Sequence, residues 1–271
     1  MDKRFILTVF SKYWKTQPAE ELAEIIHGLG FGGVEFPLRD GYQAEPQTAE
    51  KTLPEITRKL SGYGIKIMSV AAAADEHIFS ACALAGVPLI RICVSYDKND
   101  DYFESEARTR RSIEQFLPLC EKYKVKVGIQ QHCGPGINST MEMLRLVEKY
   151  DPNLVGGVWD AGHSGLAGEE PEQAIDIIKN NLTIVNFKNA YYKRANGPEA
   201  DEAEFSWYFT TGRQGACSWR RALQRLKKIG YEGNICLTAE YSDSENTEKY
   251  AKEDCAYIKT LIDDIYGEGC Y

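Results

Sequence analysis

The sequence lacks any long apolar segment. Its first apolar run, Phe5 to Phe10, is far shorter than the roughly 20 residues of a membrane-spanning helix. The run is also shorter than the core of a signal peptide, about 7–15 residues, and no small-residue cleavage site follows it. We therefore expect a cytoplasmic protein with no membrane partner.

Positive charge and paired cysteines are also scarce. The 32 Lys and Arg residues are outnumbered by 40 Asp and Glu residues, which gives a net charge of −8. This balance disfavours a nucleic-acid partner, because binding to phosphates depends on Lys and Arg. None of the eight cysteines forms a Cys-x-x-Cys pair, and several, such as Cys93, lie inside apolar runs. We interpret them as reduced, mostly buried thiols of a cytosolic protein.

No Ser/Gly-rich linker or low-complexity tract divides the 271 residues. One domain over residues 1–271 is therefore the better interpretation of this length. No Gly-x-Gly-x-x-Gly follows the first predicted strand, which disfavours the doubly wound sheet as the alternative fold.

Short apolar runs alternate with longer amphipathic stretches along the whole chain. The runs are rich in β-branched residues and have the length of buried parallel strands. The eight predicted strands are Phe5–Val9, Gly33–Phe36, Ile65–Val70, Leu89–Val94, Lys126–Gln131, Leu154–Asp160, Thr183–Lys188 and Ile235–Glu240. The predicted helices are Ala19–Leu29, Thr48–Tyr63, Glu76–Ala85, Glu106–Tyr123, Asn138–Tyr150, Pro171–Asn180, Ser218–Ile229 and Ser244–Tyr266. Eight such alternations predict an α/β fold, a single (β/α)8 TIM barrel.

Polar residues stand where several predicted strands end. The later strands deliver Gln130, Asp160, Asn186 and Glu240, with Gln131, His132, His163, Lys188 and Asn189 beside them. Glu35 and Arg91 come from earlier strands. Because active sites of TIM barrels lie at the carboxyl ends of the strands, we expect these side chains to meet at one mouth. Two structural alternatives remain open: Asp160 and Glu240 as helix caps, and Glu35 with Arg91 as a buried ion pair.

These strand ends resemble the sugar phosphate isomerase/epimerase family, the xylose isomerase-like TIM barrels. The family carries Glu-x-His after strand five, Asp-x-x-His after strand six, His-x-Lys-Asp after strand seven and Glu after strand eight. Asp160, His163, Lys188 and Glu240 match this pattern, and His132 keeps the first histidine. The segment from Gly212 to Trp219 matches a further Gly-rich motif of the family.

The resemblance implies one divalent metal ion held at Gln130, Asp160, Asn186 and Glu240. In the family these positions carry Glu, Asp, His and Glu, and the two glutamates also move protons on the sugar. This chain departs from the pattern at Gln130 and Asn186, and Asn189 replaces the usual Asp. An all-oxygen set favours Mg²⁺, Mn²⁺ or Ca²⁺ over Zn²⁺, and an absent metal is the alternative.

An amide cannot accept a proton at neutral pH, so Gln130 is excluded from a proton relay. Glu240 is then expected to act as the general base or a metal ligand, with Lys188, His132 or His163 as its partner. Gln131, His132, Glu35, Arg91 and Asn189 are expected to bind substrate.

The long connection after the seventh strand carries Arg194 and Arg213. Loops at this place in TIM barrels often bind phosphate, so we expect these arginines to bind an anionic group of the substrate.

The leading functional hypothesis is an isomerase or epimerase that moves a proton next to the carbonyl of a small carbohydrate. One alternative is a sugar-binding protein that has lost the relay, motivated by Gln130 and Asn186. Another is a lyase or dehydratase, because β-elimination begins with the same proton abstraction. An endonuclease for abasic DNA is disfavoured by the four histidines and the negative charge. The resemblance also implies a homo-oligomer.

Overall fold

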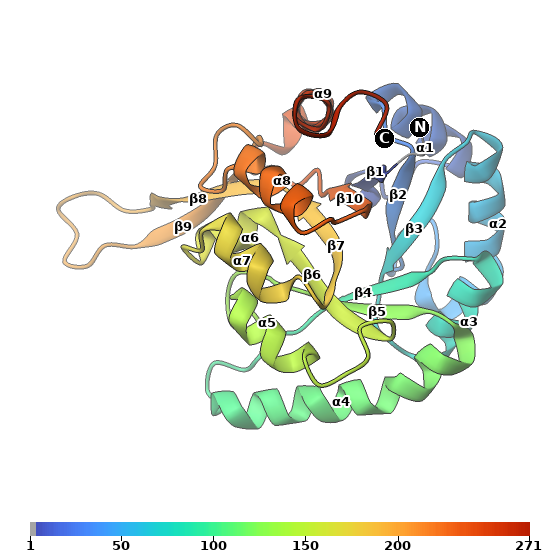
Figure 1. Ribbon diagram of the computed structural model, residues 1–271, viewed down its shortest axis with the longest axis horizontal. Coiled ribbons are helices and arrows are strands. Elements are labelled where there is room, and N and C mark those ends of the chain that lie inside the picture. Colours follow the sequence, from blue (N-terminus) through green and yellow to red (C-terminus); the bar gives the residue numbers. More distant parts are fainter. Residues whose placement is uncertain (1–3) are drawn as a thin grey trace.

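Eight parallel strands close into a barrel in the computed structural model, which describes residues 4–271 (Figure 1). The strands are β1 (Phe5–Phe10), β2 (Gly33–Pro37), β3 (Lys66–Ala71), β4 (Leu89–Cys93), β5 (Lys126–Gln130), β6 (Val155–Asp160), β7 (Leu182–Phe187) and β10 (Gly233–Leu237). Each follows its neighbour in chain order around the barrel, and β10 pairs with both β7 and β1. The predicted TIM barrel is confirmed, although its last strand ends earlier than expected and leaves Glu240 in the following loop.

Helices surround the barrel as an outer ring (Figure 1). They are α1 (Ala19–Leu29), α2 (Ala49–Gly62), α3 (Glu76–Ala85), α4 (Tyr102–Tyr123), α5 (Thr140–Val147), α6 (Ala161–Leu166), α7 (Pro171–Ile178), α8 (Trp219–Lys228) and α9 (Thr247–Tyr266). Helix α1 buries Leu22 and Ile26 and ends at Gly30, which adopts a φ of 92°. Helix α4 begins earlier than predicted because the side chain of Asp101 caps its first turn. Within the described residues, no helix is both long and apolar enough to cross a bilayer.

Two apolar cores flank the barrel wall. The larger one lies between the strands and the helices. A smaller cluster consists of Phe10, Ala71, Leu89, Val158, Ile184 and Cys236. Successive side chains of a strand point to opposite faces, so Val158 and Asp160 share the interior face of β6. The smaller cluster thus forms an apolar floor beneath the polar residues at the strand ends.

Gly128 makes room for this floor. A Cβ atom at this position would lie 2.6 Å from Cγ2 of Val158. We expect Gly128→Ala to lower the free energy of unfolding by about 1–3 kcal/mol, as overpacking of a core does. Gly28→Ala is the matched control: Gly28 lies on α1 with nothing within 4 Å of the added Cβ. It should stabilise by about 0.5–1 kcal/mol. Urea unfolding of both variants measures the difference, and equal effects would contradict the packing argument.

An antiparallel hairpin that the sequence did not predict leaves the barrel after β7. It consists of β8 (Asn189–Arg194) and β9 (Phe205–Thr210), and it projects beyond the ring of helices (Figure 1). At its base, Phe209 exchanges hydrogen bonds of 3.0 Å with Ser242, which follows β10. The hairpin is therefore fixed at its base against the loop that carries Glu240.

The structure agrees with the prediction that the cysteines are unpaired and mostly buried. All eight lie in the described part of the chain as free thiols, and only Cys93 and Cys133 are not buried.

Candidate active site

Four predicted residues from the strand ends converge at the barrel mouth. Nζ of Lys188 lies 2.9 Å from Oε2 of Glu240 and 4.0 Å from Oδ2 of Asp160. Nε2 of Gln130 donates a hydrogen bond of 2.8 Å to the same Oδ2 of Asp160. Asp160 and Lys188 are buried, whereas a quarter of the Glu240 side chain is exposed. The mouth therefore presents a carboxylate and an ammonium, in contact with each other, to an incoming molecule.

Asp160 combines two roles that the sequence left as alternatives. It ends β6 and also caps α6, where Oδ1 accepts from the backbone N–H groups of Gly162 and His163, both at 3.1 Å. The other oxygen, Oδ2, faces Gln130 and Lys188. Burial raises the pKa of Asp160, an effect that the charge of Lys188 opposes. The cap fixes the carboxylate and leaves one oxygen for the mouth.

Glu35 and Arg91 form the buried ion pair that the sequence allowed. Nε and Nη2 of Arg91 donate to the two carboxylate oxygens of Glu35 at 2.9 and 2.7 Å. Ser69 donates a third hydrogen bond to Glu35 at 3.2 Å. These contacts use both oxygens of Glu35, so the pair supports the mouth from below.

Gln130 links this ion pair to Asp160. Nη1 of Arg91 donates to Oε1 of Gln130 at 2.6 Å. Because a guanidinium can only donate, the oxygen of the Gln130 amide must face Arg91. Its NH₂ group must then face Asp160, as the 2.8 Å contact requires. The orientation of the amide is set by its neighbours.

Glu240 lies between two ammonium groups. Lys12, which the sequence reasoning missed, donates to Oε1 at 2.7 Å, and Lys188 donates to Oε2. Burial would raise the pKa of Glu240, but the two lysines outweigh it and hold the pKa well below its ordinary range. Burial would likewise lower the pKa of Lys188, but Glu240 and Asp160 hold it above its ordinary value. At neutral pH the mouth therefore holds an ionised carboxylate and a charged ammonium.

His163 offers a free donor. Its Nδ1 accepts a hydrogen bond of 3.1 Å from the backbone N–H of Cys133. The neutral ring therefore carries its proton on Nε2, and this buried atom has no partner among the described residues. Burial, together with the charges of Lys188 and His132, lowers the pKa of His163 well below its ordinary value. A neutral N–H group is thus available for an oxygen of a bound molecule.

His132 stands at the outer edge of the mouth. Its exposed ring lies 4.2 Å from that of His163, measured between centroids. The potential ligand atoms of His132, Cys133 and His163 lie within 4.8 Å of one another. Such a nitrogen and sulfur set would suit Zn²⁺ better than Mg²⁺.

Gln131 and Asn189, both expected to bind substrate, lie apart from the mouth. Nε2 of Gln131 donates to Glu169 at 2.8 Å. Nδ2 of Asn189 donates to the backbone oxygens of Gly212 and Cys217 at 2.9 and 2.7 Å. Gln131 follows the end of β5 and Asn189 begins β8, and these hydrogen bonds hold both amides on neighbouring loop groups and not on the residues of the mouth.

The two arginines expected to bind an anion also lie elsewhere. Arg194 is at the far end of β8, where it donates to Asn196 and to the backbone oxygen of Gly197. The guanidinium of Arg213 stacks on the ring of Tyr257 at 3.8 Å. The hairpin carries one arginine away from the barrel and the stacking holds the other, so neither is part of the mouth.

The residues expected to hold a divalent cation do not fit one in this arrangement. Gln130 turns its NH₂ group, not its oxygen, toward Asp160. The ammonium of Lys188 stands within 4.0 Å of both remaining carboxylates, and a like charge there opposes a second cation. Asn186 is in register with Asp160 on the neighbouring strand, and neither atom of its buried amide has a partner among the described residues. A single amide oxygen with two already paired carboxylates is a poor ligand set for a hard cation.

A cavity of about 420 Å³ opens beside Glu240. Its lining includes Lys12, Tyr13, Tyr42, Phe209 and Tyr241. The ring of Phe209, from the hairpin, lies 4.6 Å from Nζ of Lys188 and 6.0 Å from the ring of His163. Aromatic walls next to charged groups suit a sugar, which has apolar faces and polar edges.

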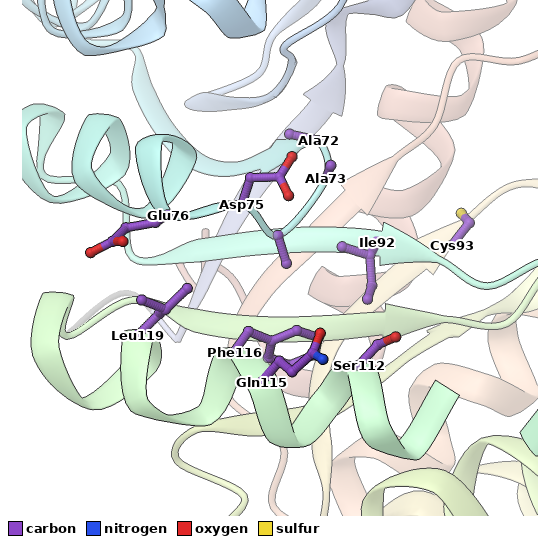
Figure 2. Close-up of a pocket in the computed structure, with 11 residues that line it drawn as sticks. Ala72, Ala73, Asp75, Glu76, Ile92, Cys93, Ser112, Gln115, Phe116 and Leu119 are labelled. Atoms are coloured by element: carbon purple, nitrogen blue, oxygen red, sulfur yellow. The ribbon is translucent and has the colours of Figure 1, made fainter. Parts of the chain in front are cut away.

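A larger cavity of about 590 Å³ lies between α4 and the segment joining β3 to α3 (Figure 2). Ser112, Gln115, Phe116 and Leu119 of α4 line one wall. Cys93 of its lining contacts a residue of the mouth: Sγ of Cys93 lies 3.4 Å from Oε1 of Gln130. This cavity lacks the paired charges of the mouth and is not the candidate site.

The comparisons with known proteins identify the family of this barrel. Residues 23–261 match a family model described as xylose isomerase-like TIM barrel. An inosose dehydratase of Lacticaseibacillus casei is 24% identical over 169 residues, 60% of this chain and 56% of that protein. The chain thus spans little more than half the length of the curated relatives it matches.

Two solved structures share the fold. A D-psicose 3-epimerase, crystallised in the presence of D-fructose, superposes with a TM-score of 0.70 at 13% identity, covering 97% of this chain and 99% of that one. The IOLI protein, whose structure holds a zinc atom, gives 0.69 at 17% identity, covering 96% and 97%. At these identities the likeness shows the fold alone. The family model matches most of the chain, and the solved structures share its fold. The chain therefore belongs to the xylose isomerase-like TIM barrel family.

Proposed function

We propose that this protein moves a proton next to the carbonyl group of a small carbohydrate, as an isomerase or epimerase does. The observation that carries the proposal is the 2.9 Å pair of Lys188 and Glu240 at the edge of an aromatic-walled cavity. A carboxylate base next to a fixed cation is what enolate chemistry needs, because negative charge moves from the base to the carbonyl oxygen.

Glu240 removes the proton from the carbon next to the carbonyl. Lys188 and the Nε2–H group of His163 donate to the carbonyl oxygen as it becomes an enolate oxygen. Glu240 returns the proton to the former carbonyl carbon, while a proton passes from the neighbouring hydroxyl group to the enolate oxygen, and an isomer results. An epimer forms instead when a second acid, Lys188 or His163, gives a proton to the opposite face of the same carbon; Glu240 then loses its proton to solvent and that acid regains one. When Lys188 donates to the substrate, its hold on Glu240 weakens and the carboxylate becomes a stronger base.

A dehydratase is the second candidate, favoured by the inosose dehydratases among the curated relatives. The same proton is removed first. A hydroxide then leaves from the next carbon and is protonated to water by Lys188 or His163. The two candidates share their base and differ in their product.

Deuterium exchange tests the proposal. Keto sugars, aldo sugars and an inosose are incubated with the protein in D₂O and followed by proton NMR. We expect loss of one C–H signal next to the carbonyl in at least one compound. A dehydration product would instead show the ultraviolet absorbance of an enone. Binding without exchange or dehydration across the panel would overturn the proposal in favour of a sugar-binding protein.

Glu240→Gln should slow this exchange by about 10²–10⁴-fold, because the amide keeps the shape but cannot accept the proton. Glu245→Gln is the matched control, since Glu245 is exposed on the short helix Ser244–Asn246 and lines no wall of the cavity. It should leave the rate unchanged. An unaffected rate in Glu240→Gln would remove the proposed base.

A further inference from the structure

We propose that the ammonium of Lys188 takes the place of a divalent cation at this barrel mouth, so that the site needs no metal ion. The binding half of this inference stands on geometry alone. Its catalytic half, in which Lys188 polarises the carbonyl, rests on the proposed function.

The charges of the mouth are already balanced by side chains. Arg91 pairs with Glu35, while Lys12 and Lys188 pair with Glu240, and Lys188 also approaches Asp160. Three cationic groups thus face three carboxylates within one connected set. A divalent cation would add two positive charges to a group that has no carboxylate in excess.

The hydrogen bonds of the mouth run in one direction. Arg91 donates to Gln130, and Gln130 donates to Asp160. A glutamate at position 130 would still accept from Arg91, but it would set a second carboxylate against Asp160. Such a pair needs a cation or a shared proton between its members. A glutamine satisfies both neighbours with no cation, so Gln130 is the residue type that suits a mouth free of metal.

The position of Lys188 completes the argument. Its Nζ approaches both Asp160 and Glu240, the two carboxylates that remain of the expected ligand set. It is 3% exposed and is packed under Phe209, so it is held in place rather than mobile on the surface. An ion that coordinated both carboxylates would have to displace this buried ammonium or lie directly against it.

Asn186 then has a different task. Its buried amide, in register with Asp160 and with both atoms unpartnered among the described residues, offers an NH₂ group as donor and a carbonyl oxygen as acceptor. Hydroxyl groups of a substrate can accept from the first and donate to the second. A histidine at this position, as the family carries, would instead supply a nitrogen ligand to a metal.

Metal titration tests the inference without any substrate. Chelator-treated protein is titrated with Mn²⁺, Mg²⁺ and Zn²⁺ by calorimetry, and the thermal midpoint is recorded with each ion. We expect no saturable Mn²⁺ or Mg²⁺ binding to the native chain and no shift of its midpoint. The Cys133→Ser variant separates any Zn²⁺ held by His132, Cys133 and His163, which should be lost in this variant.

Restoring the expected ligands should create the missing site. We expect the double variant Gln130→Glu with Asn186→His to gain saturable Mn²⁺ binding with one ion per chain. Adding Lys188→Met to the double variant should tighten that binding by about tenfold or more, because a like charge beside the ion is removed. Circular dichroism confirms that each variant is folded before titration.

Three results would overturn the inference: stoichiometric Mn²⁺ or Mg²⁺ on the native chain, no gain of binding in the folded double variant, or no tightening on removal of Lys188. Failure of the proposed function is a separate result, because it appears in deuterium exchange and leaves these titrations unchanged.

Discussion

We expect Lys188→Met to slow proton exchange at the substrate by about 10²–10³-fold, the loss that follows removal of one donor to a developing oxyanion. Methionine keeps most of the length of the side chain and its packing under Phe209 but carries no charge. Steady-state rates from the deuterium-exchange assay measure the effect on kcat.

The pH profile of the same variant separates a chemical role from a structural one. In the native chain Lys188 helps to hold the pKa of Glu240 below its ordinary value. Removing that charge raises the pKa of Glu240, so the carboxylate becomes protonated at a higher pH. The acid side of the rate profile should therefore move to higher pH. If the variant were slower but the acid side of its rate profile did not move, the loss of rate would come from displaced side chains and not from the missing charge.

Lys12→Met is the comparison for this prediction. Lys12 contacts the other oxygen of Glu240, and its side chain is 41% exposed against 3% for Lys188. Its removal should also move the acid limb upward, but the loss of rate should be smaller because solvent can hydrate the carboxylate at that side. Equal losses of rate in both variants would contradict a special role for Lys188.

The barrel and the centre of its mouth could be predicted because both follow from repetition. Apolar runs at regular spacing indicate parallel strands, and the carboxyl ends of such strands meet at one edge. Asp160, Lys188 and Glu240 therefore had to lie near one another once the fold was known.

Which of two neighbouring polar residues faces the mouth was harder to predict. Gln130 and Gln131 are adjacent, yet one bonds to Asp160 and the other to Glu169. The alternation along β5 places Gln130 on the interior face with Gly128, which lies against Val158. Gln131 lies beyond the end of β5, and Lys188 and Asn189 lie where β7 gives way to β8, so strand alternation does not apply to these three side chains.

The hairpin could not be predicted from alternation. Its strands carry aromatic residues on both faces, as Tyr191 pairs with Tyr208 and Tyr192 with Trp207. No apolar face is therefore distinguished from a polar one. Because the hairpin was not predicted, two consequences of it were missed: Phe209 covers Lys188, and Arg194 lies away from the barrel.

The largest effect on stability is expected at the ion pair beneath the mouth. Arg91→Leu should lower the free energy of unfolding by about 3–5 kcal/mol, because it leaves the fully buried carboxylate of Glu35 without a counter-charge. It also removes the donor that fixes Gln130. Equilibrium unfolding in urea measures the loss.

Two controls make this prediction specific. Lys122 pairs with Glu76 at the same 2.7 Å, but both side chains are more than half exposed. Lys122→Met should therefore destabilise the protein far less than Arg91→Leu, because solvent screens an exposed ion pair. The double variant Glu35→Gln with Arg91→Leu should recover part of the loss, since no charge is then left unpaired in the interior. If Arg91→Leu destabilised the protein no more than Lys122→Met, the buried ion pair of Arg91 and Glu35 would not stabilise the fold as argued. That result would also contradict the inference of a metal-free site, which depends on Arg91 as the partner of Glu35.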